Sequence, residues 1–92
     1  MSTVIDPVVE AARAEIAALD VRLLAIVNQR IRKVAELRRY KEENEIAFVD
    51  PEREVWLIDY LGRINRGPLS ERGLRQLMGF LLTLVKREVA SG

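Results

Sequence analysis

The feature that most constrains the fold is a long first segment without a helix-breaking residue. After Pro7 the sequence has no glycine or proline until the Asp50-Pro51 pair, and its apolar residues recur every three or four positions. Asp6 is placed to cap a first turn in which Pro7 is the first residue. We therefore expect one helix over about 7–43, which at 1.5 Å per residue would be roughly 55 Å long.

This expected helix is too long for a globule made from a chain of 92 residues, because a compact chain of that size has a radius of gyration of about 12 Å. Its apolar stripe needs a surface to pack against along its whole length. A second copy of the chain is the simplest such surface, so the sequence predicts an intertwined homodimer. A monomer with a broken first helix is the alternative. The stripe consists of Val9, Ala12, Ile16, Leu19, Leu23, Ile26, Val27, Ile31, Val34 and Leu37.

Two shorter helices are expected after the first. Asp50 and Pro51 are typical of a helix start, which predicts a helix over about 51–65, and Ser70 is placed to cap another over about 70–90. No segment alternates with a period of two, so we expect no sheet. The predicted fold class is all-α, a three-helix protomer in which residues 1–92 form a single domain. The expected buried face of the third helix is Leu74, Leu77, Met78, Leu81, Leu84 and Val85.

The composition excludes several classes of site. The chain contains no cysteine and no histidine, which rules out disulfides, thiolate metal sites and histidine-based nucleophilic triads. An enzyme built from this chain would therefore need little proton transfer and no covalent intermediate. Without histidine or cysteine ligands we also expect no metal site.

The charge balance favours neither nucleic acid nor membrane as a partner, because the net charge is only +1. The basic stretch Arg30–Lys41 suits a phosphate-tracking helix when taken alone, but Glu36 interrupts it. No apolar run approaches the ~20 residues of a membrane span, and Met1–Asp6 shows no secretory signal. These features predict a cytoplasmic protein.

Several charged residues fall where the first helix should be apolar. Arg30 and Lys41 are eleven residues apart, so both leave the same helix face roughly 16 Å apart. Two cationic side chains that flank an apolar patch can bind a small dianion between them, or both side chains can extend to solvent. Arg13 lies roughly 25 Å from Arg30 along the helix. In an antiparallel dimer Arg13 would therefore serve the partner's site.

A second charged cluster, Asp50, Arg53 and Glu54, stands at the expected start of the second helix. Asp50 is interpreted as the cap. Glu54 falls on the apolar side of the helix, where a buried carboxylate needs a partner, and is interpreted as a ligand group.

These patterns resemble the all-helical, AroQ-class chorismate mutases. The resemblance implies a three-helix protomer with a very long first helix, in an intertwined dimer with two composite active sites. It implies the rearrangement of chorismate to prephenate, a unimolecular reaction on the route to Phe and Tyr that needs no cofactor. The residues that carry it are the run Arg13–Leu24, Asn28-Gln29-Arg30 with Lys41, Asp50-Pro51-Glu52-Arg53-Glu54, and Asn65–Ser70.

The resemblance also assigns a role to each candidate residue. Arg30 and the partner's Arg13 resemble the arginines that bind the two substrate carboxylates, and Lys41 resembles the lysine that touches a carboxylate and the ether oxygen. The remaining assignments are substrate contacts at the start of the second helix: Asp50 and Glu54 resemble the acids near the ring hydroxyl, and Arg53 resembles another member of the polar site.

The third helix departs from the family pattern. The family has a Ser and, four residues later, a Gln or Glu that contacts the ether oxygen, and the alignment puts Val85 and Val89 at these positions. A shift of one residue would instead put Glu88 at the second position, where it would have to be protonated to donate. With Val89 there, Lys41 would act alone on the ether oxygen. The protein would then be a weak mutase that needs an activating partner enzyme, or would act on a related substrate.

Three alternatives follow from this departure. An isochorismate-pyruvate lyase and a 4-amino-4-deoxychorismate mutase would use the same fold, but Asp50 and Glu54 favour a ring hydroxyl and so the ordinary substrate. The third alternative is a non-catalytic helical dimer that binds a metabolite or a protein.

Overall fold

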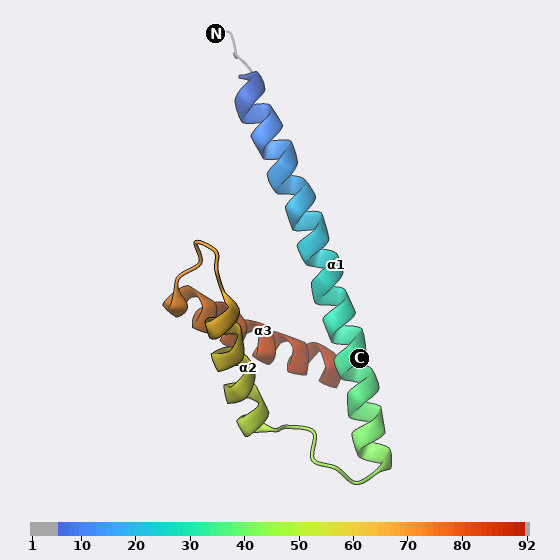
Figure 1. Cartoon of the computed structure of the whole chain (residues 1–92). Coiled ribbons are helices and arrows are strands. Elements are labelled where there is room, and N and C mark those ends of the chain that lie inside the picture. The colour runs from blue at the N-terminus through green and yellow to red at the C-terminus, as the bar shows by residue number, and fades with distance from the viewer. Residues whose placement is uncertain (1–5, 92) are drawn as a thin grey trace. The chain divides into compact units, whose positions relative to one another are not determined.

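The computed structural model describes residues 6–91, which form three α-helices and no strand. The helices are α1 (Pro7–Glu43), α2 (Pro51–Ile64) and α3 (Glu71–Ser91) (Figure 1). The all-α, three-helix prediction is therefore confirmed. Residues 1–5, which include most of the segment in which we expected no secretory signal, lie outside the described part of the chain.

The chain divides into two compact units, Met1–Arg30 and Ile31–Gly92, and α1 contributes residues to both. That residues 1–92 act as a single domain stays a prediction. Within residues 6–91, no helix is long and apolar enough to cross a bilayer. The same residues contain no group of three side chains suited to hold a metal ion.

The side-chain caps predicted from the sequence are present at the start of all three helices. Asp6 Oδ1 accepts a hydrogen bond at 2.8 Å from the backbone N–H two residues further on. Asp50 Oδ1 accepts one from the N–H of Arg53 at 3.1 Å, and Ser70 Oγ accepts one from the N–H of Gly73 at 3.0 Å. Each cap satisfies a donor that the helix itself leaves without a partner, which explains why the helices begin where they do.

In the first unit, α1 presents its apolar stripe to solvent. Ile16, Leu19 and Ile26 are each 57% exposed, and Leu23 is 58% exposed. No residue of α1, which lies wholly within the described part of the chain, is buried. Helices in water owe most of their stability to a packed apolar face, so this stripe requires a cover.

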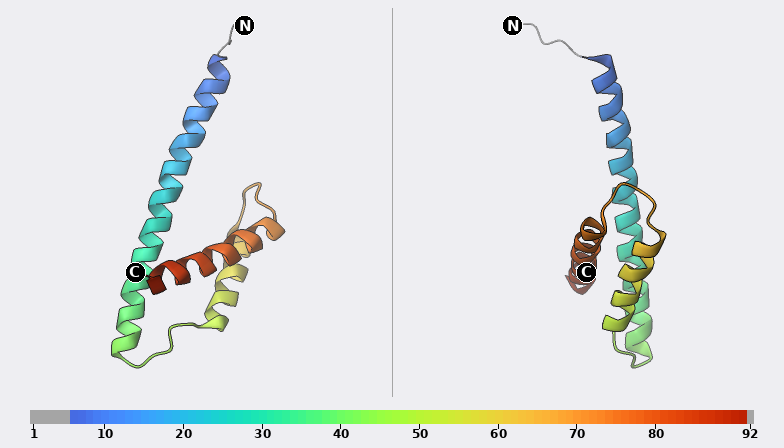
Figure 2. Two further views of the ribbon diagram at one scale, coloured as in Figure 1. Left: turned by 180° about the vertical axis from the view of Figure 1, so that it is seen from behind. Right: turned by 60° about the vertical axis from the view of Figure 1, so that its left-hand side comes forward.

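In the second unit, α2 and α3 pack against each other (Figure 2). The buried core is a single stripe on α3, made of Leu74, Met78, Val85 and Val89. Leu77 was expected in this face, but it is 54% exposed. That expectation is wrong because α3 buries one narrow stripe within the chain, and Leu77 lies beside it.

The end of α1 is closed by a two-bond C-terminal cap. The N–H of Ile46 donates to the carbonyl of Lys41 at 2.8 Å, and the N–H of Glu45 donates to the carbonyl of Glu42 at 3.4 Å. Glu45 has a φ of 56°, in the left-handed region that this motif requires. A glycine is usual at that position, so Glu45 holds a strained backbone there.

Candidate functional site

Lys41 lies at the end of α1, where the cap just described turns the chain back toward α2. Its side chain is half-buried, and its Nζ donates a hydrogen bond to the carbonyl of Phe48 at 3.1 Å. Lys41 also lines an open pocket together with Asp50, Ile46 and Val49. The second unit therefore brings one predicted site cation and one predicted site acid to the same pocket.

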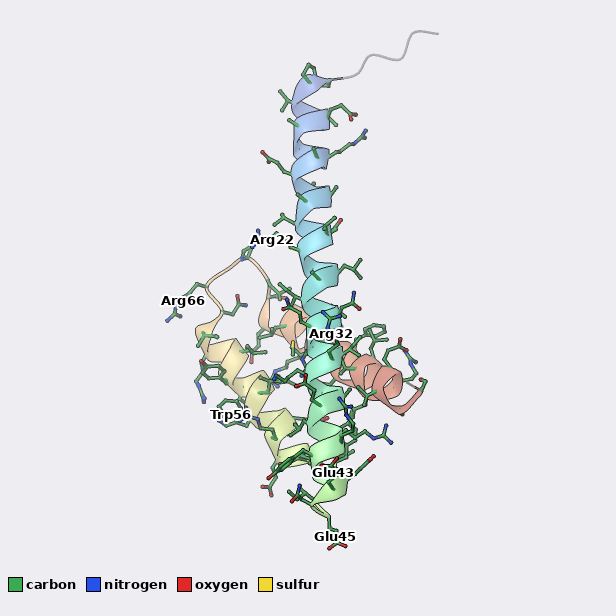
Figure 3. The ribbon with its side chains drawn as sticks, turned by 90° about the vertical axis from the view of Figure 1, so that its right-hand side faces the viewer. Arg22, Arg32, Glu43, Glu45, Trp56 and Arg66 are labelled. Carbon is green, nitrogen blue, oxygen red and sulfur yellow. The ribbon has the colours of Figure 1, made fainter. Side chains whose placement is uncertain are left out.

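Asp50 and Arg53 are engaged in local interactions at the start of α2. The Asp50 carboxylate caps the helix. The Arg53 guanidinium lies over the indole of Trp56, with Cζ 3.9 Å from the ring centroid, and Trp56 stacks on Tyr60 at 5.0 Å between centroids. Figure 3 shows the position of Trp56 on α2. Contact with an aromatic face orients the Arg53 charge along α2, and its role toward a substrate stays a prediction.

Glu54 forms an ion pair that links α2 to α3. Its Oε1 lies 2.8 Å from Nζ of Lys86. The two side chains are 31% and 34% exposed, so the pair is less accessible than any other ion pair among residues 6–91. The sequence interpretation that Glu54 needs a partner is consistent with this contact.

Lys86 was not among the residues predicted from the sequence, although a signal for it exists. Lys86 follows Leu82 by four residues and precedes Val89 by three, so it lies along an apolar face of α3. A charge within an apolar stripe was the criterion that singled out Arg30 and Lys41. The same criterion applied to the third helix would have found Lys86.

The valines of α3 at the two departing positions are core residues. Val85 is 1% exposed and Val89 is 8% exposed, whereas Glu88 is exposed. The carbonyl of Val89 accepts a hydrogen bond from Nη1 of Arg38 at 3.0 Å. Which of Val89 and Glu88 stands at the Gln or Glu position of the family stays a prediction.

Arg38 is a second residue whose role the sequence analysis missed, because it was interpreted only as part of a basic stretch. Besides its bond to α3, its Nε donates to Oε1 of Glu42 at 3.0 Å. Its Cζ also lies 5.6 Å from the centroid of the Phe48 ring. Arg38 therefore joins α1, the connection that follows it and the end of α3.

The remaining two candidates, Arg13 and Arg30, belong to the first unit. Arg13 Nη1 pairs with Oε1 of Glu10 at 3.1 Å, and both side chains are more than half exposed. Arg30 is half-buried. Both stay predicted carboxylate-binding residues.

One protein family and several known proteins are similar to this chain in sequence or in fold. The sequence profile described as "Chorismate mutase type II" matches residues 12–89. A bifunctional chorismate mutase/prephenate dehydratase of Stutzerimonas stutzeri is 33% identical in an alignment of 84 residues, and the match covers 82% of this chain. The protein with the same description from Pseudomonas aeruginosa is 32% identical over 84 residues. This chain spans 23% of the length of each of these relatives.

Two solved structures of chorismate mutase from Thermus thermophilus are similar to this chain. Form I has a TM-score of 0.82 and 27% identity, and the match covers 84% of this chain and 96% of that one. Form II has a TM-score of 0.85 and 26% identity, with 89% of this chain and 93% of that one covered. The likeness thus extends over nearly the whole of both chains.

Proposed function

Since the chain belongs to the chorismate mutase type II family, we propose that it is an isomerase that rearranges chorismate to prephenate, on the route to Phe and Tyr. The observation that carries the proposal is that Lys41 and Asp50 line one pocket. A cation for the ether oxygen and an acid for the ring hydroxyl are the pair of groups that this reaction uses at one site.

The proposed mechanism is restraint of the substrate followed by charge stabilisation. Arg30 and the partner's Arg13 bind the two substrate carboxylates and hold the enolpyruvyl arm over the ring as a near-attack conformer. As the ether bond breaks and the carbon–carbon bond forms, Lys41 stabilises the negative charge that grows on the ether oxygen. No proton transfer or covalent intermediate takes part, in keeping with a chain that lacks histidine and cysteine.

The composite site requires a homodimer, which is part of the proposal. The apolar stripe of the first unit supports it, since Ile16, Leu19 and Ile26 are each 57% exposed. A second copy of the stripe would cover these side chains and bring its own Arg13 to the site. A cytoplasmic location stays a prediction from the sequence.

The burial of Val85 and Val89 supports a low intrinsic rate, because neither side chain can donate a hydrogen bond to the ether oxygen. Loss of one such donor typically costs about 10²–10³ in rate. We therefore propose that a partner enzyme raises the activity. The relatives named bifunctional chorismate mutase/prephenate dehydratase support an enzyme of the same pathway as the first candidate to test.

The experiment that tests the proposal is incubation of the purified protein with chorismate, with products separated by chromatography. Prephenate is the expected product. Pyruvate from isochorismate would assign the protein to the lyases of this fold, and turnover of 4-amino-4-deoxychorismate alone would assign it to the amino-substrate mutases. Tight binding of chorismate without any turnover, alone or with the partner enzyme, would identify a non-catalytic binding protein.

A further inference from the structure

The ion pair between Glu54 and Lys86 has no assigned role in the proposed mechanism. It joins residues that are 32 positions apart, and its 2.8 Å distance is that of a charge-assisted hydrogen bond. Both side chains are about two-thirds covered, at 31% and 34% exposure. A pair in such a place is screened less by solvent than a surface pair, and it restricts the Glu54 carboxylate more strongly.

The pair connects a core-forming part of α3 to Glu54, a predicted site acid. The neighbouring Val85 and the later Val89 are buried in the core of the second unit. Lys86 stands between them in sequence, and its side chain reaches α2 instead of the core. Within the second unit, α3 therefore contacts Glu54, one of the predicted site acids, through Lys86.

The net charge of the ion pair affects which ring substituent the Glu54 carboxylate would bind. An unpaired carboxylate attracts an ammonium group more strongly than a neutral hydroxyl. A carboxylate paired with an ammonium is neutral overall, and the fixed Lys86 charge repels a second cation. It still accepts a hydrogen bond from a hydroxyl, since an ionised carboxylate has about four lone-pair sites.

We propose that Lys86 is a positioning residue that fixes the Glu54 carboxylate for the substrate's ring hydroxyl and disfavours a ring that carries an ammonium group. This inference rests on the proposed function, because it requires Glu54 to face the ring of chorismate. Lys86 acts through Glu54 and does not touch the substrate.

The test compares kcat and KM of the wild type, Lys86→Met, Glu54→Gln and the double variant. The substrates are chorismate and 4-amino-4-deoxychorismate, whose ring amine is protonated at neutral pH. Lys86→Met should raise KM for chorismate about tenfold, the loss typical of a charge-assisted hydrogen bond, and change kcat by less than about threefold. It should also lower the preference for chorismate over the amino substrate about tenfold. The double variant should be no worse than Glu54→Gln alone.

Two further variants separate positioning from a purely structural role. Lys86→Arg keeps the charge and should restore most of the preference for chorismate, whereas a structural defect would not follow the charge. Lys33→Met is the matched control, since Lys33 pairs with Glu36 at 3.1 Å but is 82% exposed, and it should leave both constants unchanged. If Lys86→Met loses its helical circular dichroism, Lys86→Gln replaces it in the same comparison.

Three results would overturn the inference. Unchanged values of kcat and KM in Lys86→Met would show that the ion pair has no effect on the reaction. A fall in kcat that adds to that of Glu54→Gln would show that Lys86 touches the substrate. Equal losses on both substrates would leave only a structural role. A wild type that converts no chorismate would overturn the proposed function together with this inference, whereas an active wild type with an unaffected Lys86→Met would overturn the inference alone.

Discussion

The guanidinium of Arg38 donates a hydrogen bond to the main-chain carbonyl of Val89 at 3.0 Å, across 51 positions of the chain. The carbonyls of the last turn of a helix have no partner within the helix, and a cation near them also interacts favourably with the helix dipole. Arg38 therefore caps α3 from a different element. It does so in the turn that contains Glu88 and Val89, the two residues predicted as alternatives for the Gln or Glu position of the family.

This contact predicts a loss of stability when Arg38 is removed. Arg38→Met should lower the free energy of unfolding by about 1–2 kcal/mol, the usual cost of losing a hydrogen bond that involves a charge, and urea denaturation measures it. Arg39→Met is the control, since Arg39 is exposed on the same helix. Equal stability of the two variants would contradict the cap.

Lys41 should matter more for the chemical step than for binding. In the proposed mechanism its interaction with the ether oxygen grows in the transition state, so Lys41→Met should lower kcat by about 10²–10³ and change KM much less. Steady-state kinetics with chorismate measures both constants. A rise in KM with an unchanged kcat would place Lys41 among groups that only bind the substrate.

The proposed composite site predicts rescue between two inactive variants. Arg13→Ala and Arg30→Ala should each be nearly inactive and remain dimeric. After unfolding and refolding together in equal amounts, half of the dimers would pair the two variants and carry one intact site each, so about a quarter of the wild-type activity should return. The control is each variant refolded by itself. Absence of any recovery would mean that Arg13 is not contributed by the partner.

The exposed stripe of α1 predicts which side chains would hold the proposed dimer together. Leu19→Glu should dissociate it, because a charge would be buried against the second copy. Val21→Glu should not, since Val21 is 67% exposed and lies off the stripe. Light scattering after size-exclusion chromatography measures the mass of each variant. A Leu19→Glu protein that keeps the mass of the wild-type dimer would show that the stripe is covered in another way.

The strained end of α1 predicts a stabilising substitution. Glu45 has a φ of 56°, which costs a side-chain-bearing residue roughly 1–2 kcal/mol. Glycine removes that cost but adds about 0.5–1 kcal/mol of unfolded-state entropy. Glu45→Gly should therefore raise the free energy of unfolding by about 0.5–1 kcal/mol in urea denaturation. Figure 3 shows Glu45 beyond the end of α1, exposed to solvent, so a lower stability could not be explained by lost packing and would contradict the argument.

The sequence predicted the three helices to within about one residue of their observed bounds, because the signals that start and end a helix are local. Asp50 and Ser70 lie within one turn of the backbone N–H groups from which they accept hydrogen bonds. The same reasoning was wrong for Leu77, which is 54% exposed. A period of three to four residues identifies an apolar side of a helix, but which part of that side is covered depends on the element that packs there.

The candidate site residues were predicted from charges at inward-facing or clustered positions and from their spacing in the sequence. Lys41, Asp50 and Glu54 were identified in this way, and Lys41 and Asp50 line a common pocket. The contacts of Lys86 with Glu54 and of Arg38 with Val89 span 32 and 51 positions. No local pattern specifies a pair at such separations, because the pair exists only after the helices have packed.

The helices and their caps could be predicted from the amino-acid sequence, as could the chemistry excluded by the lack of histidine and cysteine, since each depends on neighbouring residues or on composition alone. Packing between the helices was needed to establish that Val85 and Val89 are core residues and that Lys86 pairs with Glu54, a predicted site acid. Burial and ion pairing depend on which helix faces meet in space. Within α3, residues that are one position apart in sequence point to different sides of the helix.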